Sequence, residues 1–213
     1  MLAGSLATLP VMGAGEKPLG VVIQAERARL DNAEASGGAT VYSGDSFGTD
    51  TGGALRLSIG SGQIYLPASS AATLTSGSNL AHLTLTRGSI TLATPASGQL
   101  EVETPAGIVR GADGQAASGQ VTLVNPQEMI VSAYRGNLIL DNDGELHTIP
   151  EGKAYRIVID QEPDAAPVQD NYPQDVHRAK KRKKLAFYLI LTGAAALISY
   201  GAWSELSESP SKP

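Results

Sequence analysis

The sequence predicts an all-β fold of about ten to thirteen short strands, stacked as a β-sandwich or a short β-solenoid, plus one C-terminal transmembrane helix. Residues 20–160 alternate apolar and polar side chains with a period of two. Turn residues (Gly, Pro, Asn and Asp) interrupt this pattern about every eight to twelve positions. Near the end of the chain, residues 185–203 carry no formal charge and are mostly apolar. Period two indicates strands with one buried face, and a long apolar run is typical of a membrane span.

The clearest alternation is Leu55, Leu57 and Ile59, with Arg56 on the opposite face of the expected strand. Gly60-Ser61-Gly62 then turns the chain, because glycine tolerates the backbone angles of tight turns. The same pattern recurs at Ile64 and Leu66, Leu83 and Leu85, Ile90 and Leu92, Leu100 and Val102, Val121 and Leu123, Ile130, Leu138 and Leu140, and Tyr155, Ile157 and Ile159. We therefore expect these side chains to form the core.

A weak internal repeat runs through this region. Arg87-Gly88-Ser89-Ile90-Thr91-Leu92 matches Arg135-Gly136-Asn137-Leu138-Ile139-Leu140 at an offset of 48 residues, and Pro105-Ala106-Gly107 matches Pro150-Glu151-Gly152 at 45. Such matches can come from duplication of a sequence segment. They can also arise because unrelated β-hairpins use the same types of strand and turn residue. Either origin favours stacking of similar strand pairs.

Composition divides the chain into five segments. They are a signal-like or disordered segment (1–19), the β domain (20–160), a linker with prolines and acids that ends in a basic run (161–184), the transmembrane helix (185–203) and a polar tail (204–213). The prolines of the linker predict a stiff, extended connection.

The membrane prediction rests on Leu185 to Trp203. These nineteen residues would span about 28 Å as a helix, close to the roughly 30 Å of a bilayer's hydrocarbon core. Tyr188 lies near one end, and Tyr200 and Trp203 lie near the other, as in interfacial aromatic belts. A buried core helix is the alternative, but the basic run and the polar tail that flank the segment argue against it.

Charge is distributed unevenly. Residues 1–176 contain nine Lys and Arg against nineteen Asp and Glu, and six of the seven residues from Arg178 to Lys184 are basic. An acidic domain of this kind repels nucleic acid, so no nucleic-acid partner is expected. The positive-inside tendency places the basic run, and with it the β domain, in the cytoplasm. The apolar, small-residue-rich start of the chain favours the opposite, extracytoplasmic side.

Several short segments, in this order, resemble the FecR-like domain family. They are Gly44-Asp45 with Thr49, Ala54-Leu55-Arg56-Leu57, Ile64-Tyr65-Leu66, Leu85 with Arg87-Gly88-Ser89-Ile90, Val102-Glu103-Thr104-Pro105, Arg135-Gly136-Asn137-Leu138 and Pro150-Glu151-Gly152. The resemblance covers roughly residues 38–159. It implies an extracytoplasmic all-β domain in a bacterial envelope, and some members of the family pass a receptor signal to a sigma factor.

The chain also departs from that family. Those signal regulators carry a cytoplasmic helical segment and a membrane helix before the β domain, whereas here the apolar segment follows it. Gly111-Ala112 stands where the family often has Gly-Thr. The resemblance therefore implies the fold and the envelope location, without sigma-factor control and without catalytic residues.

No catalytic, cofactor-binding or metal-binding residue is expected. The chain has no cysteine, and its three histidines, His82, His147 and His177, lack metal-ligand spacing. His147 is expected to point outward from its strand, and Glu101 and Glu103 are expected to share a solvated face. Asp141 opens a calcium-like segment, but Leu146 and Gly152 occupy the positions where an EF-hand needs glycine and a bidentate acid.

Ser46 is the one candidate nucleophile. Gly44-Asp45-Ser46-Phe47 resembles the serine block of an esterase family, but Asp175-Val176-His177 has the wrong spacing for its base. We expect a turn that enters a strand. The sequence thus predicts a non-enzymatic, membrane-anchored envelope protein whose β domain binds a protein or glycan partner. The alternatives are a cytosol-facing, C-terminally anchored regulator and, third, a serine hydrolase.

Overall fold

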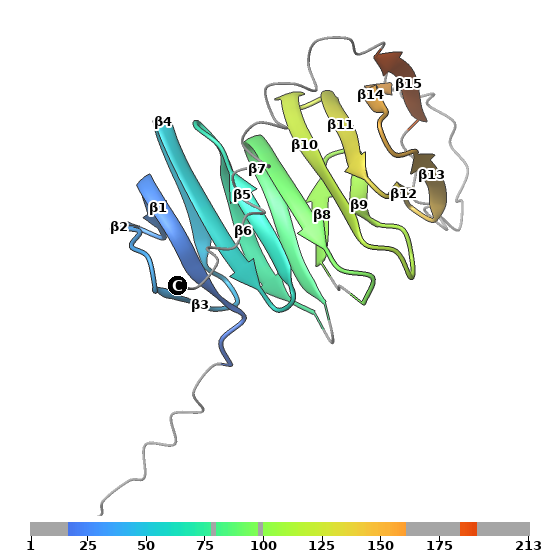
Figure 1. Ribbon diagram of the computed structural model, residues 1–213. Coiled ribbons are helices and arrows are strands. Elements are labelled where there is room, and N and C mark those ends of the chain that lie inside the picture. The colour runs from blue at the N-terminus through green and yellow to red at the C-terminus, as the bar shows by residue number, and fades with distance from the viewer. Residues whose placement is uncertain (1–16, 78–79, 98–99, 161–183, 191–213) are drawn as a thin grey trace, which may run out of the picture.

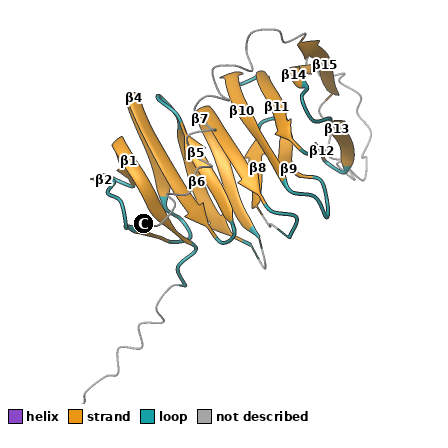
Figure 2. Cartoon of the chain, viewed as in Figure 1, coloured by secondary structure: helices purple, strands orange, loops and turns teal. Residues whose placement is uncertain are grey.

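The computed structural model describes residues 17–77, 80–97, 100–160 and 184–190, of which 71% lie in strands and none in a helix (Figures 1 and 2). The predicted all-β fold is confirmed. The strands are β1 (Gly20–Leu30), β2 (Ala33–Glu34), β3 (Thr40–Val41), β4 (Ser46–Ile59), β5 (Gly62–Leu66), β6 (Ala71–Ser76), β7 (Ala81–Thr94), β8 (Leu100–Thr104), β9 (Gly107–Gly111), β10 (Ala117–Asn125), β11 (Glu128–Arg135), β12 (Leu138–Asn142), β13 (Glu145–Ile149), β14 (Ala154–Asp160) and β15 (Lys184–Ile190).

Four of these strands close into a small barrel. The first part of β4 pairs with β6 and the last part pairs with β5. β7 pairs with the same two strands, β6 along its first half and β5 near its end. The ring β4-β5-β7-β6 is therefore complete, and β1 runs antiparallel along the outside of β4. Each ring strand has a neighbour on both sides, so the ring itself leaves no unpaired edge.

Two arms branch from β7. Its first half pairs in parallel with β8, which begins the first arm, β8-β9-β12-β13. Its second half pairs antiparallel with β10, which begins the second arm, β10-β11-β14-β15. The inner faces meet, because a Cβ built on Gly119 of β10 would lie 2.6 Å from Leu138 Cδ1 of β12. Both arms bury side chains in one core, among them Val102, Leu140, Val121 and Val131.

Glycine allows the chain to pass from one arm to the other. Gly88 lies within β7, between the part that pairs with β8 of the first arm and the part that pairs with β10 of the second arm, and has a φ of 76°. A Cβ at this position would lie 2.6 Å from the Ser69 carbonyl oxygen. Gly136, with a φ of 63°, connects β11 of the second arm to β12 of the first. The two Arg-Gly matches of the internal repeat thus both place a left-handed glycine at a crossing between arms.

The second match of the repeat does not occupy equivalent places. Gly107 begins β9 after a tight turn within the first arm. Gly152 lies between β13 and β14, where the chain crosses from the first arm to the second. The two Arg-Gly segments of the repeat therefore occupy similar places in the fold, whereas the two Pro-x-Gly segments do not.

The predicted core alternation in β4 is confirmed. Leu55, Leu57 and Ile59 are 1%, 0% and 3% exposed, whereas Arg56 between them is partly exposed on the outer face. Buried β-strand side chains alternate in this way because successive Cβ atoms point to opposite faces of a sheet.

The helix prediction is wrong for its first residues. Lys184–Ile190 forms β15, which pairs with all seven residues of β14. In a short, continuously apolar run, the spacing of apolar residues does not distinguish a strand from a helix. Here the edge of β14 supplies backbone hydrogen-bond partners along its whole length, which favours a strand. Among the described residues, no helix is long and apolar enough to cross a membrane. Residues 1–16, 161–183 and 191–213 lie outside the described part of the chain, so the predictions of a signal-like segment, a stiff linker and a polar tail stay predictions.

Candidate functional site

A row of polar side chains crosses the outer face of the first arm. The strand register aligns Thr75 of β6 with His82 of β7, His82 with Glu101 of β8, and Glu101 with Arg110 of β9. These residues alternate along their strands with buried Leu83, Val102 and Val109. Because the inward neighbours are anchored in the core, the polar members of the row are held on the solvent side.

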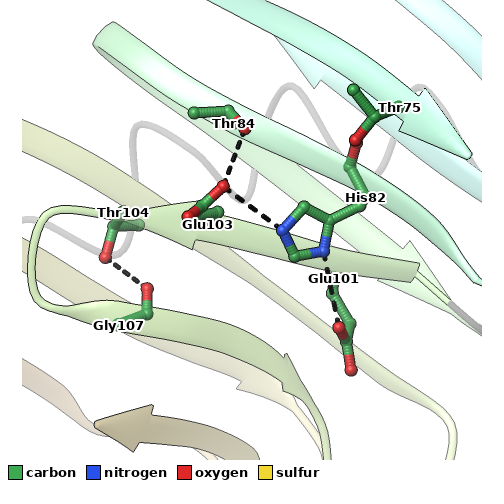
Figure 3. A network of polar contacts seen from close by, with 7 residues as sticks. All are labelled: Thr75, His82, Thr84, Glu101, Glu103, Thr104 and Gly107. Atoms are coloured by element: carbon green, nitrogen blue, oxygen red, sulfur yellow. Dashed lines mark hydrogen bonds and ion pairs between the residues drawn. The ribbon is translucent and has the colours of Figure 1, made fainter. Parts of the chain in front are cut away.

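His82 contacts two carboxylates, that of Glu101 in this row and that of Glu103 in the adjacent row (Figure 3). Its Nδ1 is 3.5 Å from Glu101 Oε2, and its Nε2 is 3.3 Å from Glu103 Oε2. The Thr84 hydroxyl donates a hydrogen bond of 2.9 Å to the same Glu103 oxygen. The parallel pairing of β7 with β8 creates this arrangement, because it sets His82 beside Glu101 and Thr84 beside Glu103.

The protonation state of the imidazole decides how many of these contacts are hydrogen bonds. A neutral imidazole has one N–H and donates to one carboxylate, whereas a protonated imidazole donates to both. The His82 and Glu101 side chains are 24% and 18% exposed, so each is only partly screened by water. Beside them, Arg110 Nη1 contacts Asp113 Oδ1 at the start of the next loop. The row therefore combines a hydroxyl, an imidazole, a carboxylate and a guanidinium group.

The network does not have the order of a nucleophilic triad. In such a triad the imidazole lies between the hydroxyl and the carboxylate and accepts the hydroxyl proton. Here the Glu103 carboxylate lies between the Thr84 hydroxyl and the His82 ring. The Thr84 hydroxyl therefore has a carboxylate as its partner and not the imidazole.

A small hollow adjoins the row. It has a volume of about 240 Å³ and is lined by Glu101 and Arg110 of the row together with Asp113 and Gln115 of the following loop. Residues that carry carboxylate, guanidinium and amide groups thus border a common space.

Ser46 lies away from this row, at the start of β4. Its hydroxyl donates to Asp31 Oδ1 at 3.1 Å, and its amide donates to the same oxygen at 2.8 Å. Asp31 has a φ of 54° and lies in the turn between β1 and β2. These hydrogen bonds connect the turn to β4. The partner of the Ser46 hydroxyl is thus a carboxylate, whereas a serine esterase needs an imidazole at this place.

The Asp141 segment forms the hairpin turn that joins β12 and β13. Asp141 Oδ1 accepts a 2.7 Å hydrogen bond from the Gly144 amide, and Asp143 and Gly144 have φ values of 51° and 90°. Two successive residues with positive φ are the signature of a type I′ hairpin turn. Within the described residues, no group of three or more His, Asp or Glu side chains could hold a metal ion.

His147 points inward, contrary to the sequence prediction. It pairs with buried Leu140 and lies on the core face of β13, where its ring centroid is 4.4 Å from that of Phe187 in β15. Leu146 occupies the outward position instead and is 58% exposed. The prediction was wrong because apolar Leu146 was expected to face the core and polar His147 to face solvent. On the edge strand β13, burial does not follow side-chain polarity. His177 lies outside the described residues.

An ion pair crosses from β11 to β14 in the second arm. Arg156 donates to both carboxylate oxygens of Glu128, at 2.6 Å and 2.9 Å. These hydrogen bonds lower the pKa of Glu128 below its usual value of 4.5 and raise the pKa of Arg156. The bidentate geometry fixes the register of β14 against β11.

Sequence reasoning found part of the row and missed the rest. The shared face of Glu101 and Glu103 is confirmed. His82 and Arg110 were missed as members of the site, because the strand pairings that bring them to Glu101 join residues distant in the sequence. The sequence did contain one indication: His82 and Thr84 alternate with apolar Leu83, which predicts that both side chains point away from the core.

Comparison with known proteins identifies no family. No model of a protein family matches the chain, and no curated protein matches it.

Proposed function

We propose that this chain is a non-enzymatic, membrane-anchored protein of the bacterial envelope whose β domain docks a protein partner on the outer face of its first arm, in a signalling role. The row of His82, Glu101 and Arg110 is the observation that carries the proposal. It presents a carboxylate and a guanidinium group side by side on an exposed sheet face, where a complementary protein surface pairs with them.

Apolar side chains on the same face favour a protein over a glycan. The register continues from Arg110 to Ile139 of β12, and the adjacent row contains Ile108 and Leu146. Leu146 is more than half exposed. Protein interfaces combine such apolar centres with a charged rim, whereas glycan sites depend on aromatic platforms and dense hydrogen bonding.

Two features of the sequence support the envelope location. The order of strands and turns resembles FecR-like domains, and the all-β fold agrees with that resemblance. The apolar stretch from Leu185 to Trp203 follows six basic residues, as a membrane anchor does. We propose that the β domain lies on the extracytoplasmic side.

Site-specific photo-crosslinking in bacterial cells tests the docking face. A photoreactive amino acid at Ile139 should give one adduct of discrete mass, and Glu101→Lys should abolish that adduct. The same amino acid at Ser132, which faces outward on the second arm, is the matched control. Equal labelling from both positions, or an adduct that survives Glu101→Lys, would refute the docking face.

A fusion experiment tests the orientation. The basic run specifically favours the alternative, a cytosol-facing regulator held by a C-terminal anchor. A reporter that is active only in the cytoplasm, fused after Pro213, should be active if the β domain is extracytoplasmic and the segment spans once. An inactive reporter, together with an active periplasmic one at the same position, would establish the cytosol-facing alternative.

A further inference from the structure

β15 is the last strand of the second arm and lies at the far end of the molecule, in the same region as β13 of the first arm (Figure 1). It pairs along the outer edge of β14, and its Leu185 and Phe187 side chains pack against the core. The Phe187 ring contacts His147 of the first arm and lies 6.5 Å from the Tyr155 ring of the second. Without β15, the backbone edge of β14 and this aromatic contact would both be open to solvent.

The residues of β15 are also the first residues of the apolar stretch that ends at Trp203. A membrane helix needs about 20 residues to cross roughly 30 Å. With Leu185–Ile190 held in the sheet, residues 191–203 would extend only about 20 Å as a helix. The same six residues are therefore required by both structures.

We propose that the outer edge of β14 is a strand-acceptor site whose occupant is the chain's own Lys184–Ile190, and that occupancy of this site and insertion of these residues into a bilayer exclude each other. This inference rests on the membrane anchor of the proposed function. The site accepts an extended apolar segment, in antiparallel register, with an aromatic side chain opposite Ile157.

The chain between the two strands permits docking within one molecule. Asp160 pairs with Lys184, so β14 and β15 form a hairpin whose connection is residues 161–183. Those residues can span up to about 75 Å when extended, far more than adjacent strands require. Insertion into a bilayer would remove β15 and expose the β14 edge, so the membrane-bound chain offers an unpaired strand to an extended partner segment.

A disulfide between β14 and β15 tests the exclusion, since the chain has no other cysteine. Tyr155 and Leu189 are direct partners. The Ile159 amide donates to the Gln127 carbonyl, on the β11 side of β14. Backbone groups of alternate residues point to the same side of a strand, so the amide and carbonyl of Tyr155 also point toward β11. Tyr155 and Leu189 therefore form a non-hydrogen-bonded pair. Such pairs bring Cβ atoms closest, which favours a disulfide between Tyr155→Cys and Leu189→Cys.

Trp203 is the sole tryptophan and reports insertion. The full-length double variant is mixed with vesicles of equal parts phosphatidylcholine and phosphatidylglycerol. Reduced protein should show a blue shift of Trp203 emission, oxidised protein should lose it, and a reductant should restore it. The single variants Tyr155→Cys and Leu189→Cys should show the shift under both conditions. A second pair, Val158→Cys with Ala186→Cys, replaces two partly exposed side chains on the outer face and guards against misfolding of the first.

Each other outcome overturns the inference in a distinguishable way. A blue shift in the oxidised protein equal to that of the reduced protein would show that docking and insertion coexist. A disulfide that forms only between chains would assign the β14 edge to strand exchange between copies. If the intramolecular disulfide forms but the reduced protein gives no shift, the membrane anchor of the proposed function fails as well, and β15 is simply the last strand of the domain.

Discussion

Replacing Leu57 with alanine should lower the free energy of unfolding by about 2–5 kcal/mol. Leu57 is fully buried near the end of β4, between Val22 of β1 and Ile64 of β5, which are also buried. The substitution removes three carbon atoms from the core, worth about 0.8 kcal/mol each in transfer from water, and the cavity left behind adds the rest. For a domain of this size each kcal/mol shifts the Tm by roughly 3 °C, so the Tm should fall by roughly 6–15 °C.

Thermal denaturation followed by circular dichroism measures this effect, and Arg56→Ala is the matched control. Arg56 is adjacent but faces outward, and its buried Nε has no hydrogen-bond partner among the described residues. Its removal should change stability by no more than about 0.5 kcal/mol. A larger loss for Arg56→Ala than for Leu57→Ala would refute the reasoning, because a register shifted by one residue would exchange the two faces.

Four further predictions follow from the structure. Gly88→Ala should destabilise the domain more than Gly152→Ala in urea denaturation, because both glycines have similar positive φ but only Gly88 lacks space for a Cβ; equal losses would contradict this. Glu128→Gln should be less stable than wild type at pH values above about 4.5. This difference should vanish as the pH falls through the lowered pKa of Glu128, and thermal melts at a series of pH values check it. Ser46→Ala should change stability by under about 1 kcal/mol, and a serine-reactive probe that labels wild type but not this variant would contradict the non-enzymatic proposal. A chain of residues 18–162 should give a β spectrum and a cooperative melt, with a lower Tm than the full chain because it lacks β15.

The local patterns of the sequence predicted the strands well. Leu55, Leu57 and Ile59 have the period of a half-buried strand, and each is buried. Strand β11 was harder to recognise, because Ile130 was its most conspicuous apolar residue but faces outward, whereas Met129 and Val131 enter the core. Hydrophobicity alone does not identify the buried face when both faces carry apolar residues.

The pairings between distant strands could not be predicted from the sequence. Closure of the ring joins Ser46 to Thr73, and the polar row requires the parallel pairing of His82 with Glu101. No local signal specifies such contacts, because they depend on the whole core packing at once. The same limitation explains β15, whose apolar residues suit a helix in a bilayer and a strand beside β14 equally well.

The central position of β7 has a consequence for hydrogen exchange. This strand pairs with β5, β6, β8 and β10, so it belongs to the ring and to both arms. Its amides cannot be released by the opening of one neighbour, and they should exchange with deuterium only through unfolding of the entire domain. β15 has one partner strand and a terminal place in the sheet, so its amides should exchange through local opening. The molecule thus places its slowest exchanging strand and one of its faster exchanging strands at opposite ends of the second arm.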